Sequence, residues 1–193
     1  MKSYFEKKDD TLIVVFHGTG GDELDLVPLV QTLFSKSSIL SLRGEVSENG
    51  MNRFFKRYAH GSFDEDSIRS EAAKIHSFLE SKITEFTRVI FFGYSNGANM
   101  IGALLSLYPS FITEAVLLHP MKVIDIPSHI NAKVVVTSGK YDQLISEQET
   151  QRFISFLQKQ GAVVTSFSFE SGHEITMDEI QTLSDHFKAE VQE

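Results

Sequence analysis

Apolar residues gather into six short runs along the chain, and longer segments with apolar residues at helical spacing separate most of them. The runs cover residues 11–17, 38–42, 88–92, 114–118, 133–138 and 163–169. Apolar runs of this length with little polar alternation are typical of strands that are buried on both faces of a sheet. Such strands with helices between them predict an α/β fold, a mostly parallel sheet with helices on both faces.

Helices are predicted between and after these strands. The first covers about residues 24–34, and an amphipathic helix begins at Asp64, where acidic residues suit a helix N-terminus. An apolar helix follows residue 95 and ends before Pro109. Two more begin at the capping-box patterns Ser146-x-x-Glu149 and Thr176-x-x-Glu179. No repeat or linker divides the chain, so we expect residues 1–193 to form a single α/β domain.

One strand leads directly into the strongest motif in the chain. The run that ends at Phe92 meets Gly93-Tyr94-Ser95-Asn96-Gly97, and an apolar run of helical length follows. This is G-x-S-x-G in the order strand, sharp turn, helix, which exposes the serine hydroxyl at the end of the sheet. The alternative is a glycine-rich turn whose serine only caps the helix. The context favours Ser95 as a nucleophile.

Candidate partners for Ser95 follow two later strands. Asp142 comes after the strand at 133–138, and His173 comes after the strand at 163–169. Ligands of parallel sheets bind beyond the carboxyl ends of the strands, so these side chains are predicted to meet Ser95. A serine hydroxyl needs an imidazole to take its proton, and the imidazole needs an acid to orient it. Serine, acid and histidine in this chain order predict a catalytic triad of Ser95, Asp142 and His173.

Each partner has an alternative interpretation. Asp142 could be a turn residue near Gly139, and His173 could be an ordinary loop histidine. His119 also follows a strand, but it comes early in the order, so we expect it to line the pocket or to pack. Asp125 is a weaker candidate for the acid. A metal site of His17, His119, Asp142 and His173 is conceivable, but no two share a helix at ligand spacing, so we expect no metal and no cofactor.

The loop after the first apolar run resembles a glycine-rich oxyanion loop. His17-Gly18-Thr19-Gly20-Gly21 bares backbone N–H groups, because most of its side chains are absent. We expect the Thr19 N–H and the Asn96 N–H to form an oxyanion hole. The alternative is a loop whose glycines only permit a tight turn.

Residues 43–63 are the least regular stretch of the chain. The segment between residues 118 and 133 is too short for a cap domain, so the irregular stretch is expected to shape the site. Apolar residues predicted to form an acyl or aryl pocket are Met51, Phe54, Phe55, Met121, Leu144 and Ile175. Core packing is the alternative for at least half of them. Arg53, Lys56 and Arg57 could bind an anion, but we favour a solvated charged face.

Composition narrows the class of function. The net charge is −8, which argues against a general nucleic-acid or anionic-membrane surface. The chain has no cysteine, which excludes disulfides and thiolate chemistry. We expect no membrane segment, because no apolar run approaches the roughly 20 residues that cross a bilayer. The first ten residues lack the apolar centre of a signal peptide, so a cytoplasmic location is expected; the pattern leaves the oligomeric state open.

With HGTGG, GYSNGA, GKYD and GHE in this order, the chain resembles an α/β-hydrolase. More narrowly, it is similar to the small carboxylesterase/phospholipase family, which includes acyl-protein thioesterases and bacterial hydroquinone-associated hydrolases. The resemblance implies a Ser95–Asp142–His173 triad, with Thr19 and Asn96 as the oxyanion residues. The chain departs from the family's HGxxDPxVP pattern around the acid, which weakens any inference about the substrate.

Two classes of function follow. The leading hypothesis is a serine hydrolase that cleaves small or short-to-medium acyl or aryl esters through an acyl-enzyme. Thioesters and lysophospholipids use the same acyl-transfer chemistry. The alternative is a catalytically silent α/β-hydrolase that binds a small hydrophobic ligand, because a fold does not determine a function.

Overall fold

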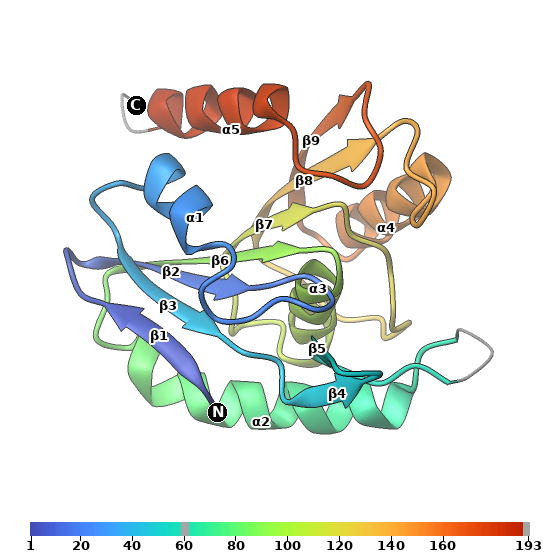
Figure 1. Ribbon diagram of the computed structural model, residues 1–193, viewed down its shortest axis with the longest axis horizontal. Coiled ribbons are helices and arrows are strands. Elements are labelled where there is room, and N and C mark those ends of the chain that lie inside the picture. Colours follow the sequence, from blue (N-terminus) through green and yellow to red (C-terminus); the bar gives the residue numbers. More distant parts are fainter. Residues whose placement is uncertain (59–61, 191–193) are drawn as a thin grey trace.

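The computed structural model describes residues 1–58 and 62–190. Its centre is a seven-stranded sheet in the order β1-β3-β2-β6-β7-β8-β9 (Figure 1). The strands are β1 Ser3–Glu6, β2 Thr11–Phe16, β3 Ser38–Leu42, β6 Arg88–Tyr94, β7 Glu114–Leu118, β8 Lys133–Gly139 and β9 Val163–Phe169. Within this sheet β1 runs antiparallel to β3, and the pairings from β3 to β9 are all parallel. The predicted α/β fold is confirmed.

Helices cover both faces of this sheet (Figure 1). They are α1 Val27–Leu33, α2 Glu65–Ile83, α3 Asn96–Leu107, α4 Glu147–Lys159 and α5 Met177–Glu190. Residues of β2 alternate between the two faces: Val14 and Phe16 pack in the core under α2, α3 and α4, whereas Ile13 and Val15 pack under α1 and α5. Both faces of the strand are therefore buried, which explains its unbroken apolar run.

Most helix ends follow the predicted signals. The Asp64 side chain accepts from the Ser67 N–H, and Ser146 and Glu149 form a complete capping box at α4. The first helix is shorter than predicted, because it begins at Val27 with Pro28 in its first turn and Asp22 holds the Leu24 N–H in a preceding turn. In the two described ranges, no helix is long and apolar enough to cross a membrane.

Two features differ from the expectation. The irregular stretch contains an antiparallel hairpin, β4 Val46–Glu48 and β5 Met51–Arg53. Its turn is Asn49-Gly50, and both residues have positive φ, 53° and 79°. Asn-Gly is the preferred pair for such a turn, so the pattern carried a usable signal for this hairpin. Strand β1 was not predicted either. It lies at the edge of the sheet, where its exposed and half-buried residues alternate and do not form an apolar run.

Candidate active site

Ser95 occupies a sharp turn between β6 and α3. Its φ and ψ of 51° and −115° are strained for a residue with a Cβ, and its N–H donates to the Leu118 carbonyl at 2.9 Å. The turn requires glycine on both sides. A Cβ on Gly93 would lie 2.7 Å from Ile101 Cδ1, and a Cβ on Gly97 would lie 2.2 Å from the Phe16 carbonyl oxygen. The backbone is thus built to bring the serine forward at the end of the strand.

The structure brings Ser95, His173 and Asp142 together. His173 Nε2 lies 2.8 Å from Ser95 Oγ, and His173 Nδ1 lies 2.7 Å from Asp142 Oδ2. These are hydrogen-bonding distances that form one chain from the carboxylate to the hydroxyl. Asp125, the other candidate acid, is exposed and pairs with Lys122 at 3.0 Å.

The second oxygen of Asp142 is held by the backbone. Oδ1 accepts from the N–H groups of Leu144 and Ile145 at 2.8 and 2.9 Å. Burial of the carboxyl opposes ionisation, but the Ile145 N–H, the His173 ring and the Leu144 N–H together hold the pKa of Asp142 below its ordinary value. Asp142 is therefore a turn residue and also the ionised acceptor for His173.

Tyr94 supports His173 from the neighbouring strand end. Its hydroxyl donates to the His173 carbonyl at 2.7 Å, and the two rings lie 5.4 Å apart at their centres. Burial, followed by the charge of Asp142, raises the pKa of Tyr94 to about 12, so the phenol remains a donor. The sequence patterns did not predict this role of Tyr94, although it directly precedes Ser95.

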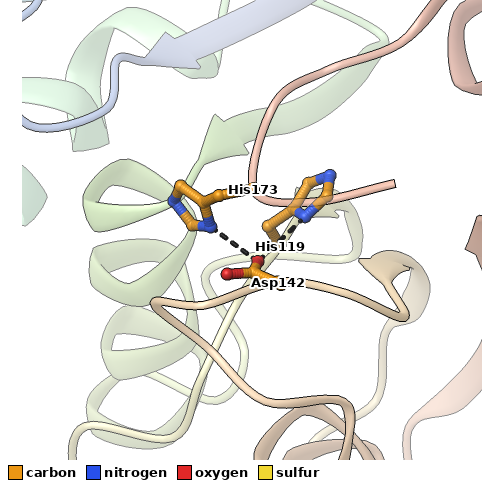
Figure 2. A group of neighbouring side chains, drawn as sticks. All are labelled: His119, Asp142 and His173. Atoms are coloured by element: carbon orange, nitrogen blue, oxygen red, sulfur yellow. Dashed lines mark hydrogen bonds and ion pairs between the residues drawn. The ribbon is translucent and has the colours of Figure 1, made fainter. Parts of the chain in front are cut away.

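His119 does more than line a pocket or pack. It is fully buried, with Nδ1 3.3 Å from Asp142 Oδ2 and Nε2 3.2 Å from Glu179 Oε2. Thr176 Oγ1 accepts from the Glu179 N–H as predicted, but the Glu179 carboxylate turns to His119 instead of completing the capping box. Both imidazoles converge on Asp142 in Figure 2.

Side-chain ligand atoms of His119, Asp142 and His173 lie within 4.8 Å of one another. The two hydrogen bonds to Asp142 account for this convergence (Figure 2). His17, the remaining member of the metal site considered from sequence, is committed elsewhere. The Gly44 N–H donates to its Nε2 at 3.0 Å, so Nδ1 carries the proton and donates to the Gly18 carbonyl. Burial lowers the pKa of His17, in keeping with this neutral form.

The glycine-rich loop is tied to the hairpin. The Gly20 N–H donates to the Asn52 carbonyl at 2.9 Å, and Arg53 Nη1 donates to Thr19 Oγ1 at 2.8 Å. Arg53 is buried and also pairs with Glu48, which corrects the expectation of a solvated residue or an anion site. Of the three cationic residues Arg53, Lys56 and Arg57, the last two are exposed. The backbone N–H of Asn96 is the first of α3, where a helix has no intrahelical acceptor.

The six pocket candidates lie in different environments. Phe54 and Phe55 are 1% and 0% exposed, so their assignment to a pocket is wrong. Phe54 packs on Phe16 at 5.1 Å and Phe55 packs on Phe63 at 5.4 Å, because the hairpin turns these rings into the core. Met51 lies over Gly20, whereas Leu144 is 73% exposed beyond Asp142. The Met121 N–H donates to Asn99 Oδ1.

Ile175 lines a cavity beside the candidate triad. The cavity has a volume of about 330 Å³. Its lining joins the glycine-rich loop to Tyr94 and to the segment after His173: Gly18, Thr19, Gly21, Asp25, Leu26, Tyr94, Glu174 and Ile175. Two of these side chains, Asp25 and Glu174, are acidic, so the cavity carries a negative rim.

Comparisons with known proteins agree with this architecture. The chain is 35% identical over 196 residues to MhqD of Bacillus subtilis (strain 168), which is named as a hydrolase; the match covers 97% of this chain and 98% of that protein. A Bacillus cereus carboxylesterase structure superposes with a TM-score of 0.91 at 35% identity, and covers 98% of this chain and 94% of that one. A Mesorhizobium loti carboxylesterase superposes at 0.87 and 26% identity, over 94% and 90% of the two chains.

No family model matches the chain. The assignment therefore rests on the relative from B. subtilis and on the solved carboxylesterases, which match over nearly the whole length of the chain. Together with the sheet order and the serine turn, they show that the chain belongs to the α/β-hydrolase family of esterase-type hydrolases.

Proposed function

We propose that this protein hydrolyses carboxylic esters with Ser95 as nucleophile, His173 as general base and acid, and Asp142 as the residue that orients His173. The observation that carries the proposal is the hydrogen-bonded chain Asp142 Oδ2, His173 Nδ1, His173 Nε2, Ser95 Oγ, with distances of 2.7 and 2.8 Å. Because ionised Asp142 accepts the proton on Nδ1, Nε2 is left as the base that faces the serine.

The reaction follows from this geometry. Ser95 Oγ attacks the ester carbonyl carbon while His173 Nε2 takes the hydroxyl proton. His173 then gives that proton to the departing alkoxide, and the acyl group remains on Ser95. Water attacks the acyl-enzyme, His173 takes a proton from the water, and the proton returns to Ser95 Oγ as the acid leaves.

The Thr19 and Asn96 N–H groups are the proposed donors to the oxyanion. Asn96 offers the first N–H of α3, where the helix dipole favours negative charge. In the loop, the Gly20 and Gly21 N–H groups bond to Asn52 and Gly18 carbonyls, which leaves the Thr19 N–H for a ligand. Arg53 holds the Thr19 side chain and therefore sets the position of this donor.

Arg53→Met is expected to lower kcat about tenfold with a smaller change in KM, because a displaced donor weakens transition-state binding more than ground-state binding. Steady-state kinetics on p-nitrophenyl butyrate measure the effect. Arg57→Met is the matched control, since Arg57 also pairs with Glu48 but is exposed, whereas Arg53 is the residue that bonds to Thr19. Equal losses in both variants would assign the effect to the hairpin and would remove the proposed role of Arg53.

The size of the cavity beside the candidate triad supports a small substrate. A volume of about 330 Å³ is at the lower end of ligand pockets, which suits a short-to-medium acyl or aryl group. Thioesters and lysophospholipids present the same acyl carbon, so they are included among the substrates to be compared.

The test is reaction of the protein with a fluorophosphonate probe and with p-nitrophenyl esters of increasing acyl length. Labelling together with turnover that falls at long acyl lengths is the expected result. A well-folded protein that neither labels nor turns over any ester would overturn the proposal. In that case, binding of the intact esters, measured by calorimetry, would identify the silent ligand-binding alternative.

The acidic rim predicts discrimination by charge. The kcat/KM for an ester with a quaternary ammonium on its acyl chain should be about tenfold higher than that for the matched ester with a terminal carboxylate. This is the size expected from the two partly solvated carboxylates of the rim, Asp25 and Glu174. The preference should shrink in high salt and in Glu174→Gln, whose amide oxygen can still accept the Gly172 N–H.

Glu85→Gln is the control for this experiment. It removes the same charge from an exposed residue before β6, at the opposite end of that strand from Tyr94. If Glu85→Gln reduced the charge preference as much as Glu174→Gln, the preference would come from the net charge of the protein and not from the cavity.

A further inference from the structure

A second imidazole lies behind the acid of the candidate triad. His119 Nδ1 is 3.3 Å from Asp142 Oδ2, the same oxygen that His173 Nδ1 contacts at 2.7 Å (Figure 2). On its other side, His119 Nε2 is 3.2 Å from Glu179 Oε2. His119 and Glu179 are both fully buried. The hydrogen-bonded chain from Ser95 therefore continues through Asp142 to His119 and ends at Glu179 on α5.

The contacts determine where protons sit. Both ring nitrogens of His119 face carboxylate oxygens, so a neutral His119 beside an ionised Glu179 would leave one nitrogen lone pair against an oxygen lone pair. The His119–Glu179 pair must therefore hold one proton more than a neutral imidazole and a carboxylate do. The pair is then either imidazolium and carboxylate or imidazole and carboxylic acid. Since Asp142 is ionised, Nδ1 of His119 carries a proton in either arrangement and donates it to Oδ2. Burial lowers the pKa of His119, but Glu179 and then Asp142 outweigh it and raise the pKa above its ordinary value.

The fold retains this pair at a cost. His119 has a φ of 50°, which a residue with a Cβ adopts rarely, and its N–H donates to the Thr137 carbonyl. Glu179 Oε1 has no hydrogen-bond partner among the described residues. Well-packed apolar side chains often stabilise such sites as well as a buried ionic pair does, so the pair is poorly explained as a stabilising device.

We propose that His119, supported by Glu179, is a positioning residue that fixes the Asp142 carboxylate and weakens its pull on the His173 proton. The proposal rests on the ester hydrolysis proposed above. The His119–Glu179 pair carries no net charge, but its positive end points to Asp142. Removing the pair therefore leaves Asp142 a stronger acceptor, which favours protonated His173.

The charged and titratable groups around His119 come from four segments. They are Asp142 after β8, His173 and Glu174 after β9, Glu179 on α5 and Tyr94 at the end of β6. Asp142 and Glu179 bond to the ring directly, whereas Tyr94 presents a ring at 6.0 Å. The experiment leaves Tyr94, Asp142, His173 and Glu174 unchanged.

Two double variants test the donor. His119→Phe with Glu179→Leu removes both polar groups and keeps apolar volume, so no buried carboxylate is left unpaired. We expect kcat to fall about tenfold with little change in KM. The acidic limb of the plot of kcat/KM against pH should move to higher pH by about half a unit, which is the size expected for one lost hydrogen bond. His119→Asn with Glu179→Leu places an amide N–H near the Nδ1 position and should recover most of kcat and return the limb toward the wild-type pH.

The rescue separates positioning from packing. Equal kcat losses and identical pH profiles in the two double variants would assign a packing role to His119 and overturn the proposal. His76→Phe is the control, because His76 lies on α2 and stacks on Tyr108 at 4.1 Å, and it should leave kcat and the profile unchanged.

A measurement on the wild-type protein covers the case in which the variants do not fold. In protein labelled with nitrogen-15 histidine, Nδ1 of His119 should carry a slowly exchanging proton across the pH range of activity. An unprotonated Nδ1 would overturn the proposal. Reaction of the same sample with the fluorophosphonate probe tests the ester hydrolysis separately. A wild-type protein that does not react would contradict the proposed ester hydrolysis, whereas the protonation of His119 would still stand.

Discussion

Ser95→Ala is expected to lower kcat/KM for p-nitrophenyl butyrate by roughly 10⁵-fold to 10⁶-fold, as for other serine nucleophiles of this type. The loss is large because the methyl group of alanine cannot form the proposed acyl-enzyme, while the proposed oxyanion donors and the neighbouring cavity remain. Fluorophosphonate labelling should vanish in the same variant, since the probe reacts with the serine oxygen. Stopped turnover with unchanged circular dichroism would separate lost chemistry from lost folding.

Ser106→Ala is the matched control for this substitution. Ser106 is a buried serine on α3, the helix that follows Ser95, and its hydroxyl donates to the Gly102 carbonyl at 3.3 Å. It should keep full labelling and turnover. Residual labelling of Ser95→Ala at the wild-type rate would place the nucleophile elsewhere and would contradict the proposed mechanism.

Asp142→Asn is expected to lower kcat/KM about 10⁴-fold while the backbone keeps its geometry. The Leu144 and Ile145 N–H groups both donate to Oδ1, so the amide oxygen of asparagine must take that place. The amide nitrogen then faces His173 Nδ1 and donates to it. His173 is left with its proton on Nε2, and it cannot accept the proton of Ser95.

Asp125→Asn provides the comparison, because Asp125 also follows a strand and was the other candidate acid. Its carboxylate is exposed and pairs with Lys122, so the substitution should change kcat/KM by less than about twofold. The measurement is steady-state turnover beside the rate of probe labelling. Full activity of Asp142→Asn would show that His173 does not depend on this carboxylate for its tautomer.

Much of the arrangement could be predicted because parallel strands end at one edge of a sheet. Ser95, Asp142 and His173 lie far apart in the sequence, but each follows such a strand, and the resulting contacts are short. The apolar runs located the strands before Ser95 and Asp142 because most residues of β6 and β8 are buried. Strand β9, which precedes His173, lies at one edge of the sheet, and all of its residues are at least partly exposed. Strand β1 had no such run, since it lies at the edge and only partly against the core.

Other contacts depended on tertiary geometry that local patterns do not contain. Phe54 and Phe55 sit in a stretch that looked like a pocket wall, but the hairpin before them directs both rings into the core. Glu179 satisfied a capping-box pattern, but its carboxylate bonds to the buried imidazole of His119, which follows β7, and not to the backbone at the helix N-terminus. Local propensity predicts the helix start correctly and the carboxylate's partner incorrectly.

The close approach at Gly97 has a consequence for how the site tolerates change. The absent Cβ lets the start of α3 rest against the Phe16 and His17 carbonyls, at the base of the glycine-rich loop. Contacts between backbone atoms therefore fix the separation between the Asn96 and Thr19 amides. Side chains around the cavity can therefore vary in size and charge without moving the two proposed oxyanion donors relative to each other, so substitutions there should change which ester is preferred and leave the proposed oxyanion hole intact.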